Sequence, residues 1–380
     1  MLKRLLAEQI HRSKQSALIL GPRQVGKSTL IRVLSPDISI NLADEEIFLQ
    51  YAGNPALLRQ RIAKEKPKTV FIDEVQRLPR LLNSLQALID EGGLKFFLTG
   101  SSARKLRRGR ANLLPGRLNT YQMGPLSLLE LDAPFDEQRA LSTGMLPGIY
   151  LDDDAKGRKK LLSSYASTYL REEVQAEALT RNIEGFARFL RFVATTSGLV
   201  TDQVKLAREA LVSRSTIQRY LEILFDTLLA YQLDAFAKTE RRRLVQHPKF
   251  YLFDVGVLNA LLGSFDVSGD RTGTLLEHAF VTQLFATAAA RDEDIRVSTY
   301  RTENGAEVDF IVEHARTTWA IELKASTQVA SHDTRGLRSF ADWHGKKHRA
   351  VIAYRGSTAR QIDGIDVLPW PELIAEMFGE

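Results

Sequence analysis

The stretch LILGPRQVGKSTLIRVL, from Leu18 to Leu34, contains the pattern GxxxxGK[ST] between an apolar run and an amphipathic segment. A glycine-rich loop of this kind surrounds phosphates with its backbone N–H groups, because side chains at the glycine positions would collide with the ligand. The helix that follows adds the positive end of its dipole. A chance match is the alternative, but this loop follows a strand and opens a helix, as phosphate binding requires. The sequence therefore predicts a triphosphate site.

The predicted nucleotide contacts occupy the whole loop. Lys27 is expected to reach the β- and γ-phosphates, and Ser28 is expected to hold Mg²⁺. ATP and Mg²⁺ are therefore the predicted cofactors. The predicted nucleotide-binding residues are Gly21, Pro22, Arg23, Gln24, Val25, Gly26, Lys27, Ser28 and Thr29.

The composition limits the class of protein. The chain has 380 residues, too many for one average domain, and 44% of them are hydrophobic, as in globular proteins. No apolar run reaches about 18 residues, so no membrane span is expected. The absence of cysteine excludes disulfides and thiolate metal sites and fits a cytoplasmic protein. A net charge of +6 permits an anionic partner such as nucleic acid.

Hydrophobic periodicity divides the chain into three parts. Short apolar runs in the first part predict a parallel sheet flanked by helices. These runs are SALIL (16–20), SINL (39–42), TVFID (69–73), KFFLT (95–99) and NTYQM (119–123). From about residue 126 to 262 the apolar spacing becomes helical, as in STIQRYLEILFDTLLAYQL (215–233).

The third part changes pattern again. It predicts a helix (274–290), strands (296–301, 306–312 and 318–325), a helix (333–344) and a last strand (349–354). Asn304-Gly305 predicts a hairpin turn between the first two of these strands. The stretch FDVSGDRTG (265–273) is the expected linker.

Two carboxylates follow the strand TVFID. Asp73 and Glu74 are expected at the carboxyl end of a sheet strand, where ligands bind in open α/β sheets. Asp73 is predicted to join the Mg²⁺ shell, and Glu74 is predicted to polarise the attacking water. The next strand ends with Thr99, Ser101 and Ser102, which could orient that water or only form a turn.

A basic stretch, ARKLRRGRANLLPGR, comes next and contains no acidic residue. It predicts a loop that faces a polyanion, with a plain solvated surface as the alternative. The cations expected to contact DNA are Arg104, Lys105, Arg107, Arg108 and Arg110. Arg117, just before the last strand, could stabilise γ-phosphoryl charge as a finger from a neighbouring subunit. A salt-bridged arginine at a strand start is the alternative.

The segments GPRQVGKST, FIDEVQ, FLTGSS and LLPGR resemble, in this order and spacing, the AAA+ superfamily. They are most similar to prokaryotic ATPases fused to a C-terminal domain of unknown function. The resemblance covers nearly the whole chain. It implies an ATPase that works as a ring, usually a hexamer, with Arg117 in the finger position. No clear second sensor arginine follows residue 125.

The helical part contains a candidate helix-turn-helix at residues 206–233. Val212-Ser213 is the expected turn, and Ser213 or Ser215 is the expected cap of the second helix. Arg214, Gln218 and Arg219 are predicted on its outer face, within reach of DNA. A basic wing is expected to follow, with Lys238, Arg241, Arg242, Arg243 and Lys249. A winged helix that binds protein instead of DNA is the alternative.

The third part has the element order of the PD-(D/E)xK nuclease fold, which includes Holliday-junction resolvases. Asp309 with Glu322 and Lys324 supplies the D…ExK pattern, in which carboxylates converge on Mg²⁺ and the lysine helps to position water. Glu277 is a possible further ligand. Alternation along the strand places Glu322 and Lys324 on one face. The alternative is a nuclease fold that serves only as a DNA-binding or ring-stabilising platform, with these charges paired to one another.

The expected fold class is α/β, with a second, α+β unit at the C-terminus. The predicted domains are 1–125, a P-loop AAA+ sheet domain; 126–175, a helical lid or connector; 176–264, a winged helix; and 265–380, a nuclease-like domain. The leading hypothesis is an oligomeric ATPase motor that remodels DNA, with a Holliday junction as the first substrate to test. An ATP-gated, Mg²⁺-dependent nuclease and a nucleotide-dependent switch that binds protein are the alternatives.

Overall fold

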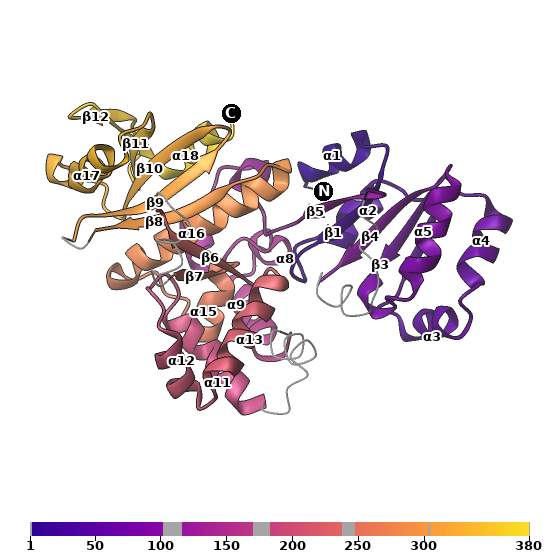
Figure 1. The fold of residues 1–380 in the computed structure, drawn as a ribbon. Helices are drawn as coiled ribbons and strands as arrows, with labels where there is room; N and C mark the ends of the chain where they lie inside the picture. The colour runs from indigo at the N-terminus through magenta and orange to yellow at the C-terminus, as the bar shows by residue number, and fades with distance from the viewer. Residues whose placement is uncertain (1, 102–115, 170–182, 238–247, 303–304, 380) are drawn as a thin grey trace.

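The computed structural model describes residues 2–101, 116–169, 183–237, 248–302 and 305–379. The described chain forms two lobes (Figure 1). The N-terminal lobe contains one sheet. The second lobe contains the helical middle of the chain and a second sheet that extends to the C-terminus.

The sheet of the N-terminal lobe has five parallel strands in the order β2-β3-β4-β1-β5. The strands are β1 (Ser16–Leu20), β2 (Ile38–Asn41), β3 (Thr69–Asp73), β4 (Lys95–Gly100) and β5 (Leu118–Gln122). Each strand lies within one residue of its predicted run, so the prediction of a parallel sheet is confirmed. Because β4 separates β1 from β3, the end of β4 lies between the glycine-rich loop and Asp73.

Helices cover this sheet as the amphipathic spacing predicts. They are α1 (Leu6–Arg12), α2 (Lys27–Val33), α3 (Glu45–Gly53), α4 (Leu57–Glu65), the 3₁₀ turn η1 (Val75–Arg77) and α5 (Leu81–Glu91). Helix α5 shows the principle clearly, since Leu81, Leu85 and Leu88 recur at helical spacing and are all buried.

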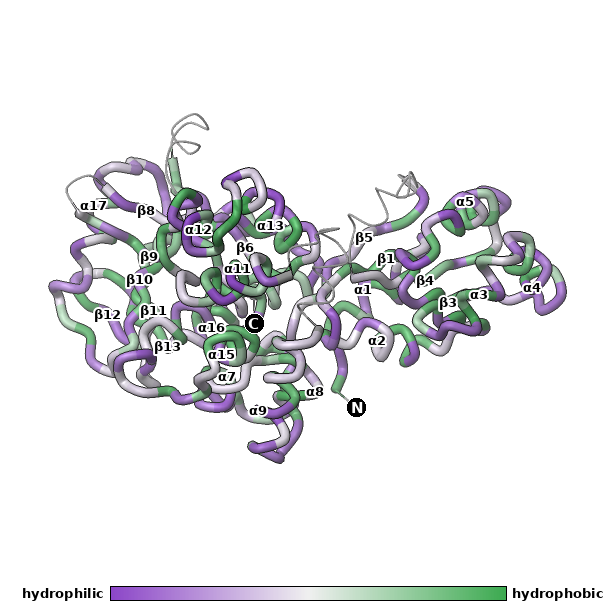
Figure 2. The backbone as a smooth tube through the Cα atoms, turned by 90° about the horizontal axis from the view of Figure 1, so that it is seen from below, coloured by the Kyte–Doolittle hydropathy of each residue, from purple (hydrophilic) through white to green (hydrophobic). Residues whose placement is uncertain are grey.

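The helical middle packs around α15, whose sequence VGVLNALL is almost entirely apolar and which lies within its lobe in Figure 2. The elements are η2 (Leu128–Glu130), α7 (Glu137–Thr143), α8 (Pro147–Tyr150), α9 (Ala155–Ser164), the π-helical turn η3 (Tyr165–Tyr169), α11 (Ile183–Thr195), α12 (Gln203–Ala210), α13 (Arg214–Asp226) and α15 (Val255–Leu262). Phe186, Phe189 and Tyr220 join α11 to α13, with ring centroids 5.0–5.8 Å apart.

The predicted pair of helices around residue 212 is present. Leu206 and Ala210 of α12 are buried, and the Ser213 side chain caps α13 by accepting a hydrogen bond from the backbone N–H of Thr216 at 3.2 Å. The prediction that helical spacing continues to Leu233 is wrong, because α13 ends at Asp226 and Leu228 adopts a φ of +58°.

The residues that follow form the strand β6 (Ala230–Ala235), which pairs antiparallel with β7 (Lys249–Leu252). Leu233 is buried and Gln232 is exposed, as in a strand with two different faces. Pairing with β7 and β8 therefore outweighs the helix-like spacing of the leucines.

The second sheet has eight strands in the order β12-β13-β11-β10-β9-β8-β6-β7. Its remaining elements are α16 (Gly269–Arg291), β8 (Arg296–Arg301), β9 (Glu307–His314), β10 (Thr317–Lys324), η4 (Ser331–Thr334), α17 (Arg335–His344), β11 (Arg349–Tyr354), β12 (Arg360–Ile362), β13 (Ile365–Pro369) and α18 (Trp370–Met377). The predicted order of helix, three strands, helix and strand is present. The assignment of this order to a nuclease fold stays a prediction.

Two features of this part differ from expectation. The predicted linker at 265–273 is helical from Gly269, because α16 begins five residues earlier than its apolar pattern suggests. The hairpin β12–β13 and helix α18 were not predicted. Asn304 lies outside the described residues, although β8 and β9 pair antiparallel as expected. No helix in the described part of the chain has both the length and the apolarity needed to span a membrane.

Candidate nucleotide-binding site

The glycine-rich loop connects β1 to α2 and requires two of its glycines. A Cβ atom on Gly21 would lie 2.1 Å from the carbonyl oxygen of Met123, so no other residue fits there without backbone movement. Gly26 caps α2 with a φ of +97°, which favours glycine. Glycine is therefore required at position 21 by the neighbouring Met123 carbonyl, while the expected collision of side chains with the phosphates stays a prediction.

The side chain of Lys27 is buried within this loop. Only 5% of the residue is exposed, and its ammonium group donates hydrogen bonds to the carbonyl oxygens of Gly21 and Pro22, both at 2.8 Å. A buried ammonium held by neutral carbonyls is positioned for exchange with phosphate oxygens, which are stronger acceptors.

Asp73, Glu74 and Thr99 come together at the carboxyl edge of the sheet. The Thr99 hydroxyl donates to the carboxylate of Asp73, and it accepts the backbone N–H of Glu74 at 3.3 Å. Asp73 is buried, and no ion pair of the described residues provides it with a cation. A buried carboxylate and the hydroxyl of Ser28 are oxygen ligands of the kind that Mg²⁺ prefers. The residues therefore fit the predicted metal.

Glu74 adopts a left-handed backbone conformation with a φ of +56°, which is unfavourable for a residue with a Cβ atom. Gln76 holds its side chain, because the amide nitrogen of Gln76 donates to the Glu74 carboxylate and to the Ser101 hydroxyl, the latter at 3.0 Å. Gln76 was not predicted from the sequence. The only available signal was its place in FIDEVQ, two residues after Glu74.

A cavity of about 550 Å³ lies between the loop and helices α8 and α9. It is lined by Arg23, Gln24, Gly26, Lys27, Ser28, Thr29, Glu74, Pro147, Gly148, Ile149 and Leu161. Of the other predicted loop residues, Gly21, Pro22 and Val25 are buried. The site is therefore closed on one side by the helical middle of the chain.

A smaller, mainly apolar pocket of about 170 Å³ adjoins this cavity and shares Gly26, Thr29 and Pro147 with it. Its other lining residues are Leu2, Lys3, Arg4, Ala7, Leu30, Val33, Leu126 and Leu151. Its walls come from the N-terminal segment, α2 and α8, which are distant in sequence. This pocket was not predicted from the sequence.

Arg117 lies at the amino end of the parallel strands, whereas the loop lies at their carboxyl end. In the parallel pair β1–β5, Ser16 is opposite Leu118 and Leu20 is opposite Gln122. The loop follows Leu20, so the length of a strand, about 15 Å, separates it from Arg117. The Arg117 guanidinium is paired with Asp90 at 2.7 Å, as in the salt-bridge alternative. Arg117 cannot reach a nucleotide bound to its own chain.

The predicted DNA contacts are only partly described. Arg214, Gln218 and Arg219 are exposed on α13, as expected. Lys249, which was expected to belong to the basic wing, is instead buried in β7 and paired with Glu277 at 3.2 Å. The remaining predicted DNA-contact and wing residues lie outside the described residues: Arg104, Lys105, Arg107, Arg108, Arg110, Lys238, Arg241, Arg242 and Arg243. Ser102, which was predicted to orient water or to form a turn, also lies outside them.

The structure brings Asp309 and Glu322 together in the second lobe. In the antiparallel strands β9 and β10, Ile321 pairs with Phe310. The next residue of β10, Glu322, is therefore opposite the preceding residue of β9, Asp309. Burial, with the neighbouring charge of Glu322, raises the pKa of Asp309 to about 7. Burial also raises the pKa of Glu322.

The other predicted members of this cluster have partners. Lys324 contacts Glu322 at 2.9 Å and Asp333 at 3.1 Å, as the platform alternative expects. Glu277 accepts hydrogen bonds from Tyr251 and Lys249. Within the described ranges, no group of three or more histidine, cysteine, aspartate or glutamate side chains is arranged to hold a metal ion. The metal-ligand set of Asp309, Glu322 and Glu277 therefore stays a prediction.

Three family models match successive parts of the chain. Residues 13–131 match an AAA domain, residues 135–268 match a domain of unknown function (DUF8612), and residues 272–373 match a domain of unknown function (DUF4143). Together with the parallel sheet and the glycine-rich loop, the first match supports a nucleotide-binding domain of the AAA type over residues 13–131. The other two parts have no function attached to their families.

Similar proteins are known from bacteria and archaea. An uncharacterized protein of Mycobacterium tuberculosis is 26% identical over 346 residues, which cover 88% of this chain and 75% of that protein. An uncharacterized protein of Methanocaldococcus jannaschii is 25% identical and covers 78% of this chain and 71% of its own length. A solved structure of the replication initiator DnaA bound to AMPPCP and single-stranded DNA is 11% identical and covers 58% of this chain and 86% of its own. Its TM-score is 0.27, which is too low to support an inference about this chain.

Proposed function

We propose that this protein is an ATPase that binds Mg-ATP at the loop of residues 21–29 and uses its hydrolysis to act on DNA. The buried Lys27 ammonium is the observation that best supports the nucleotide site. Lys27 lines a cavity that is large enough for a triphosphate and that Glu74 also lines. The adjoining pocket suits the adenine base, because its walls are mainly aliphatic.

Each residue has a defined part in the reaction. Lys27 and the loop N–H groups bind the phosphates, while Ser28 and Asp73 would hold Mg²⁺, which when bound neutralises phosphate charge. Glu74 accepts the proton of the attacking water, and its orientation depends on Gln76. Thr99 fixes the position of the Asp73 carboxylate and of the Glu74 backbone by hydrogen bonding to both.

Hydrolysis is proposed to require a neighbouring subunit. The γ-phosphate needs a positive charge opposite Lys27 in the transition state, and Arg117 of the same chain is too distant to supply it. In a head-to-tail arrangement, the end of the sheet that carries Arg117 in one subunit would face the end that carries the loop in the next subunit. Repetition of such a contact forms a ring when its rotation closes, and the resemblance to AAA+ ATPases implies such a ring.

DNA is proposed to bind along α13. Arg214 and Arg219 are exposed, and no ion pair among the described residues neutralises them. Arg214 and Gln218, four residues apart, lie on one face of the helix, and Arg219 lies beside that face. A helix with this face can enter the major groove or contact phosphates. The substrate proposed for the first test is a four-way junction.

Replacing Arg214 and Arg219 with alanine together is expected to weaken DNA binding. Two lost phosphate contacts should lower the slope of log K against log salt by about 2. Fluorescence anisotropy of a labelled four-way junction at several salt concentrations measures this slope. The control variant is Arg208→Ala on α12, whose guanidinium pairs with Glu209 at 3.6 Å. An unchanged slope in the double variant would place the DNA contact elsewhere.

A second candidate function is metal-dependent cleavage of DNA in the second lobe. The observation that favours it is the pair of opposed, half-buried carboxylates of Asp309 and Glu322, which repel each other in the folded protein. Such repulsion is useful where a divalent cation relieves it. Lys324, beside Glu322, would then position water.

This pair gives a pH-dependent prediction. Folding raises the pKa of Asp309 from 3.8 to about 7, so its contribution to stability is full below pH 3.8 and is lost as pH rises through 7. Asp309→Asn is therefore expected to be more stable than the wild type at pH 8, by roughly 2–4 kcal/mol, with little difference at pH 4. Urea unfolding at the two pH values without metal measures this difference.

Addition of Mn²⁺ then separates the two roles of the carboxylates. At pH 8 it should stabilise the wild type and leave Asp309→Asn unchanged if the pair is a metal site. Cleavage of plasmid DNA should vanish in Glu322→Ala while ATPase activity survives. Equal stability of wild type and Asp309→Asn at pH 8 would contradict the proposed repulsion. A lack of Mn²⁺ stabilisation would leave the platform alternative for this lobe.

A further inference from the structure

Arg4, near the N-terminus, is one of the few buried cations of the described chain. Its guanidinium donates to the carbonyl oxygen of Val25 in the phosphate loop at 2.6 Å. It also donates to the carbonyl oxygens of Gly124 and Pro125, just after β5, at 3.1 and 3.2 Å. Arg4 therefore joins the phosphate loop to the segment that leaves the sheet.

Glu130 completes this junction as the partner of Arg4, with 2.9 Å between Arg4 Nε and Glu130 Oε1. The Glu130 side chain is fully buried. Its carboxylate also accepts the backbone N–H of Leu5 at 3.0 Å and that of Ser127 at 3.1 Å. A buried ion pair with this many hydrogen bonds has a single geometry, so a shift of Val25 must move Glu130 and Ser127 with it.

The same segment is bonded to α16, the long central helix of the second lobe. Gln283 accepts the backbone N–H of Leu128 at 2.7 Å and donates to the carbonyl oxygen of Leu126 at 2.9 Å. The hydroxyls of Ser127 and Thr287 are 2.7 Å apart. These bonds, which we call the α16 clasp, connect both sides of Ser127 to one face of the helix.

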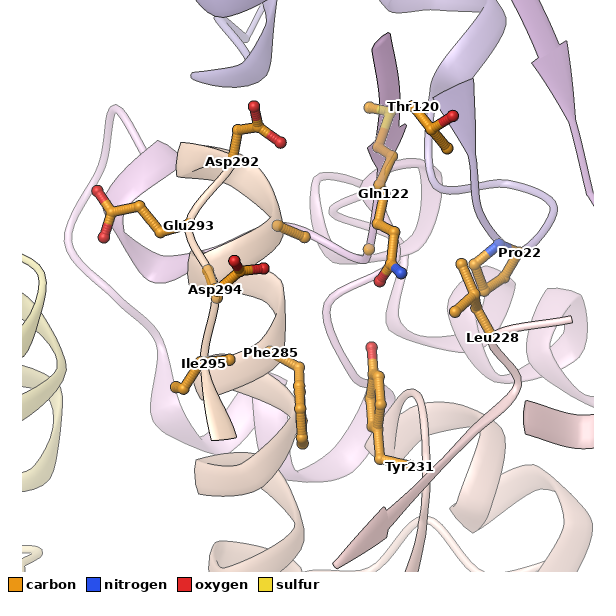
Figure 3. A pocket seen from close by; sticks show the side chains of 14 residues that line it. Pro22, Thr120, Gln122, Leu228, Tyr231, Phe285, Asp292, Glu293, Asp294 and Ile295 are labelled. Atoms are coloured by element: carbon orange, nitrogen blue, oxygen red, sulfur yellow. The ribbon is translucent and has the colours of Figure 1, made fainter. Parts of the chain in front are cut away.

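The other side of the junction between the lobes is open. A cavity of about 290 Å³ separates Pro22, Thr120 and Gln122 of the N-terminal lobe from the end of α16 (Figure 3). Phe285 and Tyr231 are stacked within it, with centroids 4.1 Å apart. Within the described part of the chain, no hydrogen bond crosses this cavity. Hydrogen bonds therefore connect the lobes on one side, and a cavity separates them on the other.

We propose that Arg4 is a positioning residue for the phosphate loop, and that Arg4, Glu130 and the α16 clasp transmit nucleotide binding to the second lobe. This inference rests on the proposed nucleotide site. A bound triphosphate draws the Lys27 ammonium from the carbonyl oxygens of Gly21 and Pro22 and so changes the loop that Arg4 holds. The displacement passes through Glu130 and Ser127 to α16. The open cavity allows the second lobe to follow.

Hydrogen–deuterium exchange of α16 with and without AMPPCP and Mg²⁺ tests the coupling. In the wild type, exchange of α16 amides should change about 5-fold or more on binding, the range of ordinary allosteric coupling. In Gln283→Ala/Thr287→Val this response should disappear while AMPPCP still binds. Thr274→Ala, at an exposed position on the same helix, is the control and should respond like the wild type.

The outcomes distinguish this inference from the nucleotide site itself. Failure of AMPPCP to bind the wild type would overturn both. Binding that leaves α16 exchange unchanged, or a response that persists in the clasp variant, would overturn the coupling alone.

The role of Arg4 is tested by variants that avoid a lone buried charge. Arg4→Ala alone would leave Glu130 unpaired, so the paired variant Arg4→Met/Glu130→Met is used. It should fold, bind AMPPCP about 10-fold more weakly, and show no α16 response. Arg4→Lys, which retains the charge without the forked donors, should restore only part of the affinity. AMPPCP affinity and α16 response equal to the wild type in the paired variant would overturn the positioning role.

Discussion

Replacing Lys27 with alanine is expected to abolish ATP hydrolysis and to weaken nucleotide binding by about 10²-fold or more, because a buried ammonium aimed at phosphate is lost. The free protein should keep its fold, since this ammonium contacts the carbonyl oxygens of its own loop. Titration with a fluorescent ATP analogue measures binding, and phosphate release measures turnover. Turnover that persists in Lys27→Ala would exclude this loop as the hydrolytic site.

Glu74→Gln is the matched variant for this experiment. It keeps the size and the hydrogen-bonding capacity that Gln76 requires, but it removes the base. Binding should stay near the wild-type value while turnover falls about 10²–10⁴-fold. The two variants together separate the residue that holds the phosphates from the residue that activates water.

Replacing Arg117 with alanine is expected to lower turnover by about 10³-fold, the lower end of what a finger arginine contributes. Nucleotide affinity should change little, because Arg117 acts on a neighbour's transition state. Stability should also change little, since the Arg117–Asp90 pair is partly exposed and such pairs contribute about 0–1 kcal/mol. A variant that loses its fold or its own nucleotide affinity would instead support a structural salt bridge.

Mixing variants tests whether Arg117 acts between subunits. Lys27→Ala retains its arginine, and Arg117→Ala retains its loop, so a mixed ring contains intact composite sites. With random assembly of equal amounts, about one quarter of the interfaces should be active. Each variant alone should be inactive. A mixture as inactive as its components would contradict a shared site.

The parts of the fold that could be predicted are those with a local signal. The strand from Ser16 to Leu20 and the loop after it are specified by contiguous residues, as is the Ser213 cap of α13. The strand β6 was missed because its leucines also fit helical spacing, and only pairing with β7 decides between the two structures. β12 and β13 are short and partly polar, and their pairing is likewise a tertiary effect.

The candidate site shows the same limit. Lys27, Asp73 and Glu74 were predicted because motif and strand position specify them. Arg4 was not, because its partner Glu130 lies 126 residues away and neither residue belongs to a motif. The lining residues Pro147 and Leu151 enter the site only through the packing of α8. Such contacts depend on chain folding and leave no pattern in a single sequence.

The steady-state ATPase rate with and without a four-way DNA junction tests the central claim most directly. The account predicts that the junction accelerates hydrolysis severalfold in the wild type, that the acceleration is reduced in Arg214→Ala/Arg219→Ala, and that Arg117→Ala is inactive with or without DNA. A wild-type rate that neither branched nor linear DNA changes would contradict the claim that this hydrolysis is directed to DNA.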